Sequence, residues 1–373
     1  MKILIVTRFI HKNYGPWVDG LIAKGHEVIF LNLGNDKLNH QSVEVINETP
    51  KPLPHILRAN SGLRTILWKR LPRKRIKEVL KSTLTDVIIC REFVLISLQA
   101  SLVSRFVLPK AQIIFYDQQK ACSMHWMRRA ARILVSKTVF TPCCDNYELE
   151  KGRRNPARVI PFSSDPRIGE TEIQRRYSDI LDRKLKLISV GKLFFEDYNF
   201  LLLLDVLKDG LLHEFELTII GSTRKTMPRF EAEIEQRAAD IRSAGGQVKV
   251  LKDLPHEKVL FHMRQSDVFV MPTVRHTAAF TQFEAMSLGL PVIIASHPSN
   301  GTTYAVKDGY NGFVVDPNKR SIANALRTVL QNRSSLMDFG LRSLRRLESE
   351  FSNEVVASRF EALFQAKEHA VST

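Results

Sequence analysis

One carboxylate in the second half of the chain has a residue type and a position that could do chemistry. Glu284 lies in the run Phe280 to Leu288, which is predicted to be a short helix ended by Gly289. An ionised carboxylate accepts at least two hydrogen bonds, which suits paired hydroxyls such as those of a ribose. The first helical N–H groups after Thr277 can hold an anion at the helix N-terminus. These features predict a site for a ligand with hydroxyl and phosphate groups.

The segments around this helix predict a parallel α/β unit. An apolar strand, Val268 to Met271, precedes the polar loop Thr273 to Ala279. Further strands are expected at Pro291 to Ala295 and, after two turns, at Gly312 to Val315. Strand, loop, helix and strand in this order indicate a βαβ unit, whose loop lies at the carboxyl end of a strand. Open α/β sheets bind their ligands there.

The same pattern recurs in the first half of the chain, which is predicted to hold a sheet of its own. Expected strands are Lys2 to Thr7, His26 to Leu33, Asp86 to Cys90, Gln112 to Tyr116 and Thr138 to Phe140. The opening run MKILIVTRFI is interpreted as a buried strand rather than a signal peptide. At 373 residues, with 44% hydrophobic and 25% charged residues, the chain suits two globular domains.

Two runs in the second half resemble a known family. PTVRHTAAFTQFEAMSLGLPVI and the later VKDGYNGFVV are similar to the donor-binding segment of family-four-type retaining glycosyltransferases with the GT-B fold. That family has two glutamates separated by seven residues; Glu284 matches the second, and His276 stands at the place of the first. The usual Pro-Phe-Gly of the loop is replaced by Thr277, Ala278 and Ala279, with Phe280 one place on. The resemblance is specific between Phe269 and Val315 and covers the remaining chain in outline.

The resemblance implies an α/β fold of two Rossmann-like domains facing each other across a cleft. The expected domains are an acceptor-binding domain over residues 1–170, a nucleotide-sugar domain over 171–350, and a C-terminal helix over 351–373 that packs back on the first domain. In the first domain, the loop after the first strand corresponds to an acceptor or phosphate loop. Tyr14 and Gly15 are its candidate residues.

The resemblance also assigns residues to the nucleotide-sugar. Glu284 would bind the ribose, backbone groups near Leu254 the base, and Lys192 the diphosphate, with Gly221 in a neighbouring tight turn. The family's second phosphate-binding cation should fall near Asp197 or Tyr198, neither of which is basic. Arg224 or Lys225 is the candidate replacement.

The reaction centre implied by the resemblance comprises Lys192, His276 and Asp117, of which Asp117 follows a predicted strand. Three interpretations remain open. The first is retaining transfer, with His276 against the donor sugar. The second is an inverting displacement with Asp117 as general base, and the third is a degenerate site without turnover. Asp117 is equally compatible with a helix cap or a turn.

Residues 64–81 form a strongly basic segment, with eight Lys and Arg against one acid. Apolar residues recur at helical spacing at Ile76, Val79, Leu80 and Leu84. The segment is either a surface helix with a solvated basic face or an amphipathic helix on anionic lipid. Because enzymes of this family often glycosylate lipid-borne acceptors with this half, the membrane interpretation is favoured. Its lipid-facing residues would be Trp68, Arg73, Lys74, Arg75 and Lys77.

Charge and cysteine spacing limit the partners. The net charge of +16 indicates a polyanionic partner. Nucleic acid is disfavoured because no nucleic-acid-binding motif is present and the basic residues are not interleaved with aromatics. Neither a metal-binding Asp-x-Asp nor a metal spacing among the four cysteines occurs, so no metal and no cofactor is expected beyond the nucleotide-sugar substrate.

These observations predict a cytoplasmic glycosyltransferase, peripheral on the inner face of the cell membrane, that acts on a lipid-linked or polysaccharide acceptor. Two alternatives belong to other classes. A sugar-nucleotide epimerase would share the architecture without needing the basic segment. A basic lipid-binding scaffold would retain the fold with an inactive site.

Overall fold

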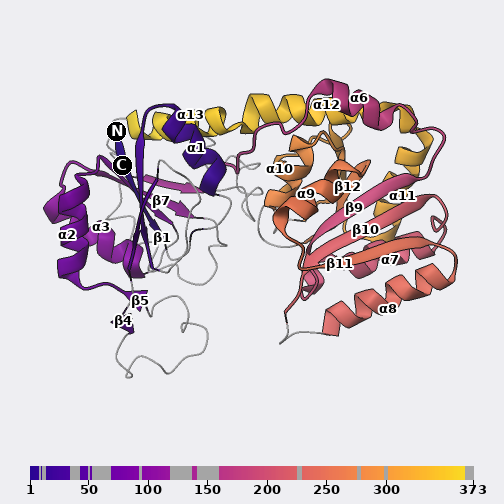
Figure 1. Cartoon of the computed structure of the whole chain (residues 1–373), viewed down its shortest axis with the longest axis horizontal. Helices are drawn as coiled ribbons and strands as arrows, with labels where there is room; N and C mark the ends of the chain where they lie inside the picture. The colour runs from indigo at the N-terminus through magenta and orange to yellow at the C-terminus, as the bar shows by residue number, and fades with distance from the viewer. Residues whose placement is uncertain are drawn as a thin grey trace, which may run out of the picture. The chain divides into compact units, whose positions relative to one another are not determined.

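The computed structural model of the chain contains two α/β units (Figure 1). The structure describes residues 1–7, 10, 14–33, 43–48, 51–52, 69–91, 95–117, 137–140, 159–224, 229–274, 279–297 and 301–365. Within these residues, the first unit holds 1–140, 159–163 and 353–365, and the second unit holds 164–352.

The first unit is built on a six-stranded parallel sheet with the order β3-β2-β1-β6-β7-β8. Its strands are β1 (Lys2–Thr7), β2 (Glu27–Asn32), β3 (Glu44–Asn47), β6 (Val87–Arg91), β7 (Gln112–Asp117) and β8 (Lys137–Phe140). The short strands β4 (Lys51–Pro52) and β5 (Lys69–Arg70) form a separate antiparallel pair. The central strands read as continuous apolar runs because helices cover both faces of the sheet.

Two helix pairs cover this sheet. Helices α2 (Arg73–Thr83) and α3 (Leu95–Val107) pack on the face that carries Leu4 and Val6. Helices α1 (Gly15–Ala23) and α13 (Asn353–Gln365) pack on the opposite face, which carries Ile3 and Ile5 (Figure 1).

The last helix belongs to the first unit because it packs closely on α1. The rings of Trp17 and Phe360 lie 4.8 Å apart between their centroids. A Cβ at Gly20 would lie 2.2 Å from the backbone oxygen of Asn353, so only glycine allows this approach. Lys24 and His26 hold the carboxylate of Glu361 at 3.1 and 3.0 Å, which adds polar contacts to the apolar ones.

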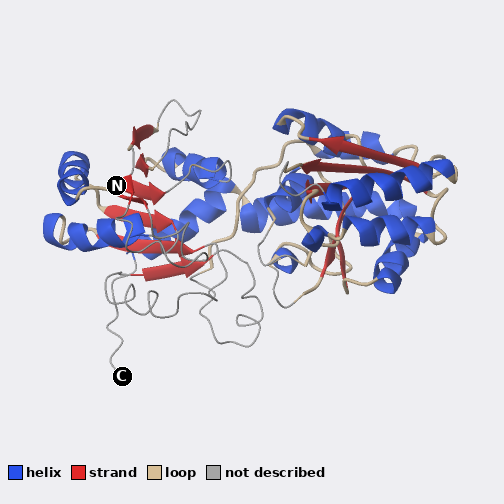
Figure 2. Cartoon of the chain, turned by 90° about the horizontal axis from the view of Figure 1, so that it is seen from below, coloured by secondary structure: helices blue, strands red, loops and turns tan. Residues whose placement is uncertain are grey.

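The second unit repeats the architecture with the strand order β11-β10-β9-β12-β13-β14, again all parallel. Figure 2 shows the helices packed around its strands. Its strands are β9 (Leu185–Lys192), β10 (Phe215–Ser222), β11 (Gln247–Lys252), β12 (Val268–Met271), β13 (Val292–Ala295) and β14 (Gly312–Val315). Its helices are α6 (Glu170–Tyr177), α7 (Phe200–Lys208), α8 (Arg229–Ser243), α9 (His256–Arg264), α10 (Phe280–Ser287), α11 (Lys319–Gln331) and α12 (Leu336–Arg346).

The predicted fold class, two parallel-sheet α/β domains, is confirmed. The strands predicted at Val268 to Met271 and Gly312 to Val315 have those bounds, and the predicted helix at Phe280 ends one residue earlier, at Ser287. Leu84, the last apolar residue at helical spacing, lies just beyond α2 in the left-handed conformation (φ 47°) and is exposed. Among the described residues, no helix is both long and apolar enough to cross a membrane.

Candidate functional site

The carboxyl edge of the second sheet gathers the residues that the sequence singled out for donor binding. Lys192 ends β9, Gly221 lies at the end of β10, and Leu254 follows β11. Helix α10, which carries Glu284, follows the loop after β12. Because all six strands are parallel, these ends share one edge of the sheet, which is where such sheets bind ligands.

Two glycines shape the centre of this edge. Gly191 and Gly221 are paired across β9 and β10. A Cβ on Gly221 would lie 2.6 Å from Cγ of Leu193, and a Cβ on Gly191 would lie 2.2 Å from the ring of Tyr198. The small residues therefore let the chain after β9 fold tightly over the ends of both strands.

Two cations stand on neighbouring aromatic rings at the same place. Nζ of Lys192 lies 5.8 Å from the centroid of the Phe195 ring, and Cζ of Arg224 lies 5.6 Å from that of Phe194. The centroids of the two rings are 4.5 Å apart. The structure thus brings Arg224 towards Lys192, although 32 positions separate them in the sequence. Lys225 lies outside the described residues.

The loop after β11 is held by the end of β10. Asp253 has a left-handed backbone (φ 49°), and its N–H donates to the backbone oxygen of Gly221 at 3.0 Å. Its carboxylate accepts from Oγ1 and from the backbone N–H of Thr223, and these two hydrogen bonds hold the pKa of Asp253 below its usual value. Leu254, whose backbone is the candidate contact for the base, directly follows this fixed residue.

The loops after β9 and β12 are joined by hydrogen bonds. Thr273 Oγ1 and the N–H of Val274 both donate to the backbone oxygen of Asp197, at 2.8 and 2.9 Å. Nδ2 of Asn199 donates to the backbone oxygen of Pro272 at 2.7 Å. Asp197 lies near the position at which the family resemblance implies a second phosphate-binding cation. In this protein the backbone oxygen of Asp197 instead holds the neighbouring loop. His276, Thr277 and Ala278 follow this anchor but lie outside the described residues.

Glu284 is a buried acid, with 3% of its surface exposed. It lies in the second turn of α10, which begins at Phe280 after the extended residue Ala279. Nε2 of His256 donates a hydrogen bond to Oε1 of Glu284. Sequence analysis missed His256, since nothing in the local pattern of α9 indicates that its first residue meets a helix 28 positions later.

In the first unit, the structure describes the predicted site residues Tyr14 and Gly15 but not the side chain of Asp117. Tyr14 was predicted to line a ligand loop, but it is 1% exposed, and its hydroxyl donates to Oγ1 of Thr7 at 2.9 Å. Its ring packs edge-on against Phe30, so Tyr14 is a core residue. A Cβ added to Gly15 would meet nothing within 4 Å. Asp117 is the last residue of β7, one position beyond the predicted end of the strand, and its side chain lies outside what the structure describes.

The basic helix α2 borders a hollow beside α3. A cavity of about 280 Å³ is lined by Arg73, Lys74 and Lys77 from α2 and by Val103, Phe106 and Val107 from α3. Phe106 is 76% exposed, which is unusual for a large apolar side chain. Trp68 lies outside the described residues.

Arg75 differs from the other cations of α2. Its Nε donates to Glu48 at 2.6 Å and its Nη1 to Glu78 at 3.3 Å. These hydrogen bonds, chiefly that to Glu48, raise the pKa of Arg75. Its guanidinium is therefore paired within its own unit, unlike the cations that line the hollow.

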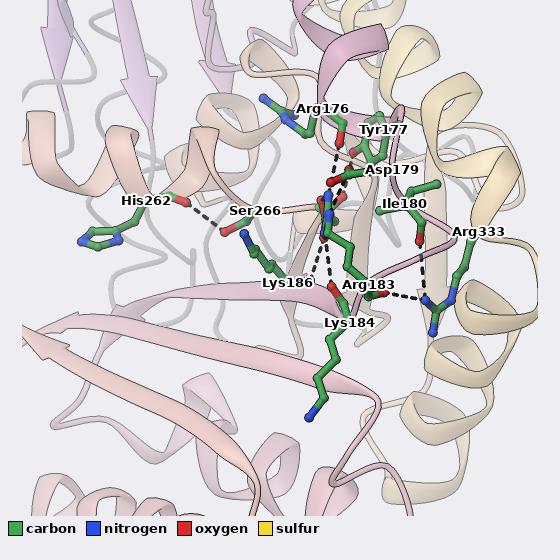
Figure 3. A network of polar contacts seen from close by, with 11 residues as sticks. Arg176, Tyr177, Asp179, Ile180, Arg183, Lys184, Lys186, His262, Ser266 and Arg333 are labelled. Atoms are coloured by element: carbon green, nitrogen blue, oxygen red, sulfur yellow. Dashed lines mark hydrogen bonds and ion pairs between the residues drawn. The ribbon is translucent and has the colours of Figure 1, made fainter.

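The opposite, amino edge of the second sheet is held by a buried ion pair. Nη1 and Nη2 of Arg183 donate to the carboxylate of Asp267 at 2.6 and 2.9 Å. The N–H of Lys186 donates to the same carboxylate at 2.7 Å, and the hydroxyl of Tyr177 donates to the backbone oxygen of Asp267 at 2.8 Å. Figure 3 shows Arg183 at the centre of this network, with Nη1 of Arg333 on its backbone oxygen at 2.7 Å. The network ties α6 and the turn that follows α11 to the sheet and has a structural role.

Comparisons with known proteins agree with the two-domain α/β fold and with the position of the candidate site in the second unit. Residues 170–345 match the family model described as Glycosyl transferases group 1. The crystal structure of Anabaena Alr3699/HepE in complex with UDP superposes with a TM-score of 0.70, covering 97% of this chain and 99% of that chain at 14% identity. The protein therefore has the GT-B fold, and most of its second unit is similar to the group 1 glycosyltransferase model.

Two curated relatives give a narrower comparison. The D-inositol 3-phosphate glycosyltransferase of Geodermatophilus obscurus is 30% identical over 131 residues, which cover 34% of this chain and 28% of that protein. The capsular polysaccharide biosynthesis glycosyltransferase CapM of Staphylococcus aureus is 27% identical over 99 residues, 26% of each chain. The alignments thus span about a quarter of the length of these relatives.

Proposed function

We propose that this protein transfers a sugar from a nucleotide-sugar donor to a hydroxyl group of a lipid-linked or polysaccharide acceptor in cell-surface glycan biosynthesis. The observation that carries the proposal is the buried carboxylate of Glu284 on the same sheet edge as Lys192 and Arg224. A carboxylate for a ribose and two cations for a diphosphate are the groups that a nucleotide-sugar requires. A structural neighbour was crystallised with UDP, and the names of both curated relatives include glycosyltransferase.

The donor is held, in this proposal, without a metal. Lys192 and Arg224 face the diphosphate and stabilise the negative charge that develops on it as the sugar leaves. The N–H groups at the start of α10, around Ala279 and Phe280, add the positive end of a helix. Glu284 takes the ribose hydroxyls, and the backbone at Leu254 meets the base.

The stereochemical course is proposed to be retaining, because the sequence around Glu284 follows the frame of a retaining family. His276 then lies against the donor sugar, and the first unit, including the loop with Gly15, binds the acceptor. An inverting course would instead need Asp117 as the base that deprotonates the acceptor hydroxyl. The anomeric configuration of the product, read by NMR at early reaction times, separates the two: inversion would rule out the retaining course.

Attachment to an anionic membrane is proposed for the first unit, on the inner face of the cell membrane. Three cations and the exposed ring of Phe106 surround one hollow beside α2 and α3. Anionic headgroups pair with such cations while an apolar side chain enters the acyl boundary. This surface and the similarity to the capsular polysaccharide glycosyltransferase support the proposed acceptor class.

The experiment that tests the proposal is a thermal-shift screen of the full chain against UDP-, GDP-, ADP- and CMP-sugars and their free nucleotides, with EDTA present. A ligand that binds only the folded protein stabilises it by about 2.7 kcal/mol at a hundred times its Kd. We expect one nucleotide class to raise Tm despite the chelator. A response that appears only after Mg²⁺ or Mn²⁺ is added would overturn metal independence, and no response at all would favour the lipid-binding scaffold.

An incubation with the responding sugar nucleotide and no acceptor then separates transferase from epimerase. Conversion of the donor to an epimer under these conditions would contradict the proposal. A transferase leaves the donor largely intact until a glycan or lipid acceptor is supplied.

A further inference from the structure

We infer that His256 is a positioning residue for the ribose-binding carboxylate of Glu284. This inference rests on the proposed function, since it assigns a task to a neighbour of the proposed donor site. The observation behind it is the hydrogen bond from Nε2 of His256 to Oε1 of Glu284, which joins the first turn of α9 to the second turn of α10.

The direction of this hydrogen bond follows from the acceptor. An ionised carboxylate only accepts, so Nε2 of His256 must carry the proton that it shares with Glu284. Within the part of the chain that the structure describes, His256 is the side chain that contacts this carboxylate. The side chain of His256 remains 34% exposed, whereas that of Glu284 is 4% exposed. His256 is thus the solvent-exposed partner of this hydrogen bond, and Glu284 is the buried one.

A buried carboxylate needs such a partner to hold one orientation. With Oε1 engaged by His256, rotation of the carboxylate is restricted, and Oε2 with the remaining lone pair of Oε1 stays available for ligand hydroxyls. Fixing these acceptors before the ligand arrives lowers the entropy lost on binding. The residue therefore acts through Glu284 and does not itself contact the ribose.

The backbone that carries His256 is itself fixed. Pro255 precedes it and accepts backbone hydrogen bonds from Lys258 and Val259, which start α9. Two residues before that, Asp253 is held by Thr223 and Gly221. The proposed base contact at Leu254 and the support of the ribose contact therefore share one rigid segment, so base and ribose are positioned together.

The test compares ribose and deoxyribose ligands. Calorimetry of the full chain with UDP, ADP and GDP and with their 2′-deoxy forms gives a ratio of deoxy to ribo Kd. The variants are Glu284→Ala, His256→Ala and His256→Gln, whose amide can donate in place of the imidazole. His262→Ala is the control, because it removes the same residue type from the far end of α9.

We expect the native protein to bind the ribonucleotide about tenfold more tightly than the deoxy form, the equivalent of one hydrogen bond to a charged group. Glu284→Ala brings the ratio close to one, and His256→Ala moves it most of the way there. His256→Gln restores a large part of the preference, and His262→Ala leaves it unchanged.

Three results would overturn the inference in distinguishable ways. Equal weakening of ribo and deoxy forms by His256→Ala shows that the histidine merely supports the fold. A second result is a ratio of deoxy to ribo Kd that is unchanged in both His256 variants while Glu284→Ala loses the preference for ribose. That result shows that His256 does not position Glu284, and it leaves the proposed donor site intact. If none of the nucleotides binds the native protein, both the proposed function and this inference are wrong.

Discussion

At the scale of single residues, the proposed donor site depends on the hydrogen bonds that the buried carboxylate of Glu284 accepts. Glu284 is buried, yet it lies beside the first turn of a helix that starts at the ligand edge of the sheet. Burial of an ionised carboxylate is costly unless hydrogen bonds compensate it. His256 supplies one such bond, and in the proposal a ribose supplies the others.

Replacing Glu284 by Gln is expected to weaken nucleotide binding by about 10- to 100-fold, because hydrogen bonds to a charged acceptor are lost while the shape is kept. Calorimetry with the nucleotide found in the thermal-shift screen measures this. Glu214→Gln serves as the control, since Glu214 precedes β10 at the opposite edge. An unchanged Kd in Glu284→Gln would remove this residue from the site.

A second residue-scale prediction concerns the stability of the second unit. Arg183→Ala leaves the fully buried carboxylate of Asp267 without its guanidinium and should lower the free energy of unfolding by about 3–5 kcal/mol. The hydrogen bond to Asp267 is also the main reason that the pKa of Arg183 is raised. Asp179→Asn removes only the exposed partner of Arg183 and should have a much smaller effect on stability, because surface ion pairs are screened by solvent. Urea unfolding that gives equal losses for the two variants would show that the buried pair contributes little.

At the scale of elements, α2 carries cations of two kinds. Lys77 and its neighbours line the hollow beside Phe106, whereas Arg75 is paired with Glu48 and Glu78. The helix is therefore not uniformly available to lipid, although its sequence is uniformly basic. This difference provides a matched pair of variants with the same change in net charge.

Lys77→Gln is expected to weaken binding to anionic vesicles several-fold, because each cation near such a surface contributes about 1 kcal/mol to the binding free energy. Arg75→Gln should have a clearly smaller effect, and Phe106→Ser should weaken binding without changing the charge. Vesicle co-sedimentation at increasing salt checks this, because exposed charges are screened within about 10 Å at 0.1 M salt. Indistinguishable results for Lys77→Gln and Arg75→Gln would assign the attraction to net charge alone.

At the scale of the whole molecule, the last described helix, α13, packs in the first unit, which also contains the start of the chain. Apolar contacts of Trp17 with Phe360 and the Glu361 ion pairs hold α13 on α1 and β2. Burial would raise the pKa of Glu361, but hydrogen bonds from Lys24 and His26 outweigh it and leave the pKa lowered. The folded form therefore binds this proton less readily than the unfolded form.

The sign of this shift predicts a loss of stability in acid. The contribution of Glu361 is present above its unfolded pKa, about 4.3, and disappears as the pH falls through the lower folded value. Glu361→Gln should reduce stability more at pH 6 than at pH 3.5. Urea unfolding at the two pH values measures the difference, with Glu354→Gln on the same helix as control. A Glu361→Gln effect that does not depend on pH would mean that only packing holds α13.

The sequence by itself determined the two parallel sheets, the strands at Val268 and Gly312, and the place of Glu284 on a short helix at a strand end. These features follow from apolar runs and turn residues, which act over a few neighbouring positions, and from the rule that parallel strands end at one edge. Only the tertiary structure decided that His256 meets Glu284, that Arg224 and Lys192 lie over adjacent aromatic rings, that Arg75 pairs with Glu48, and that Tyr14 is buried. Such pairings depend on how helices and loops far apart in the sequence pack on the sheets, and no local pattern records that packing.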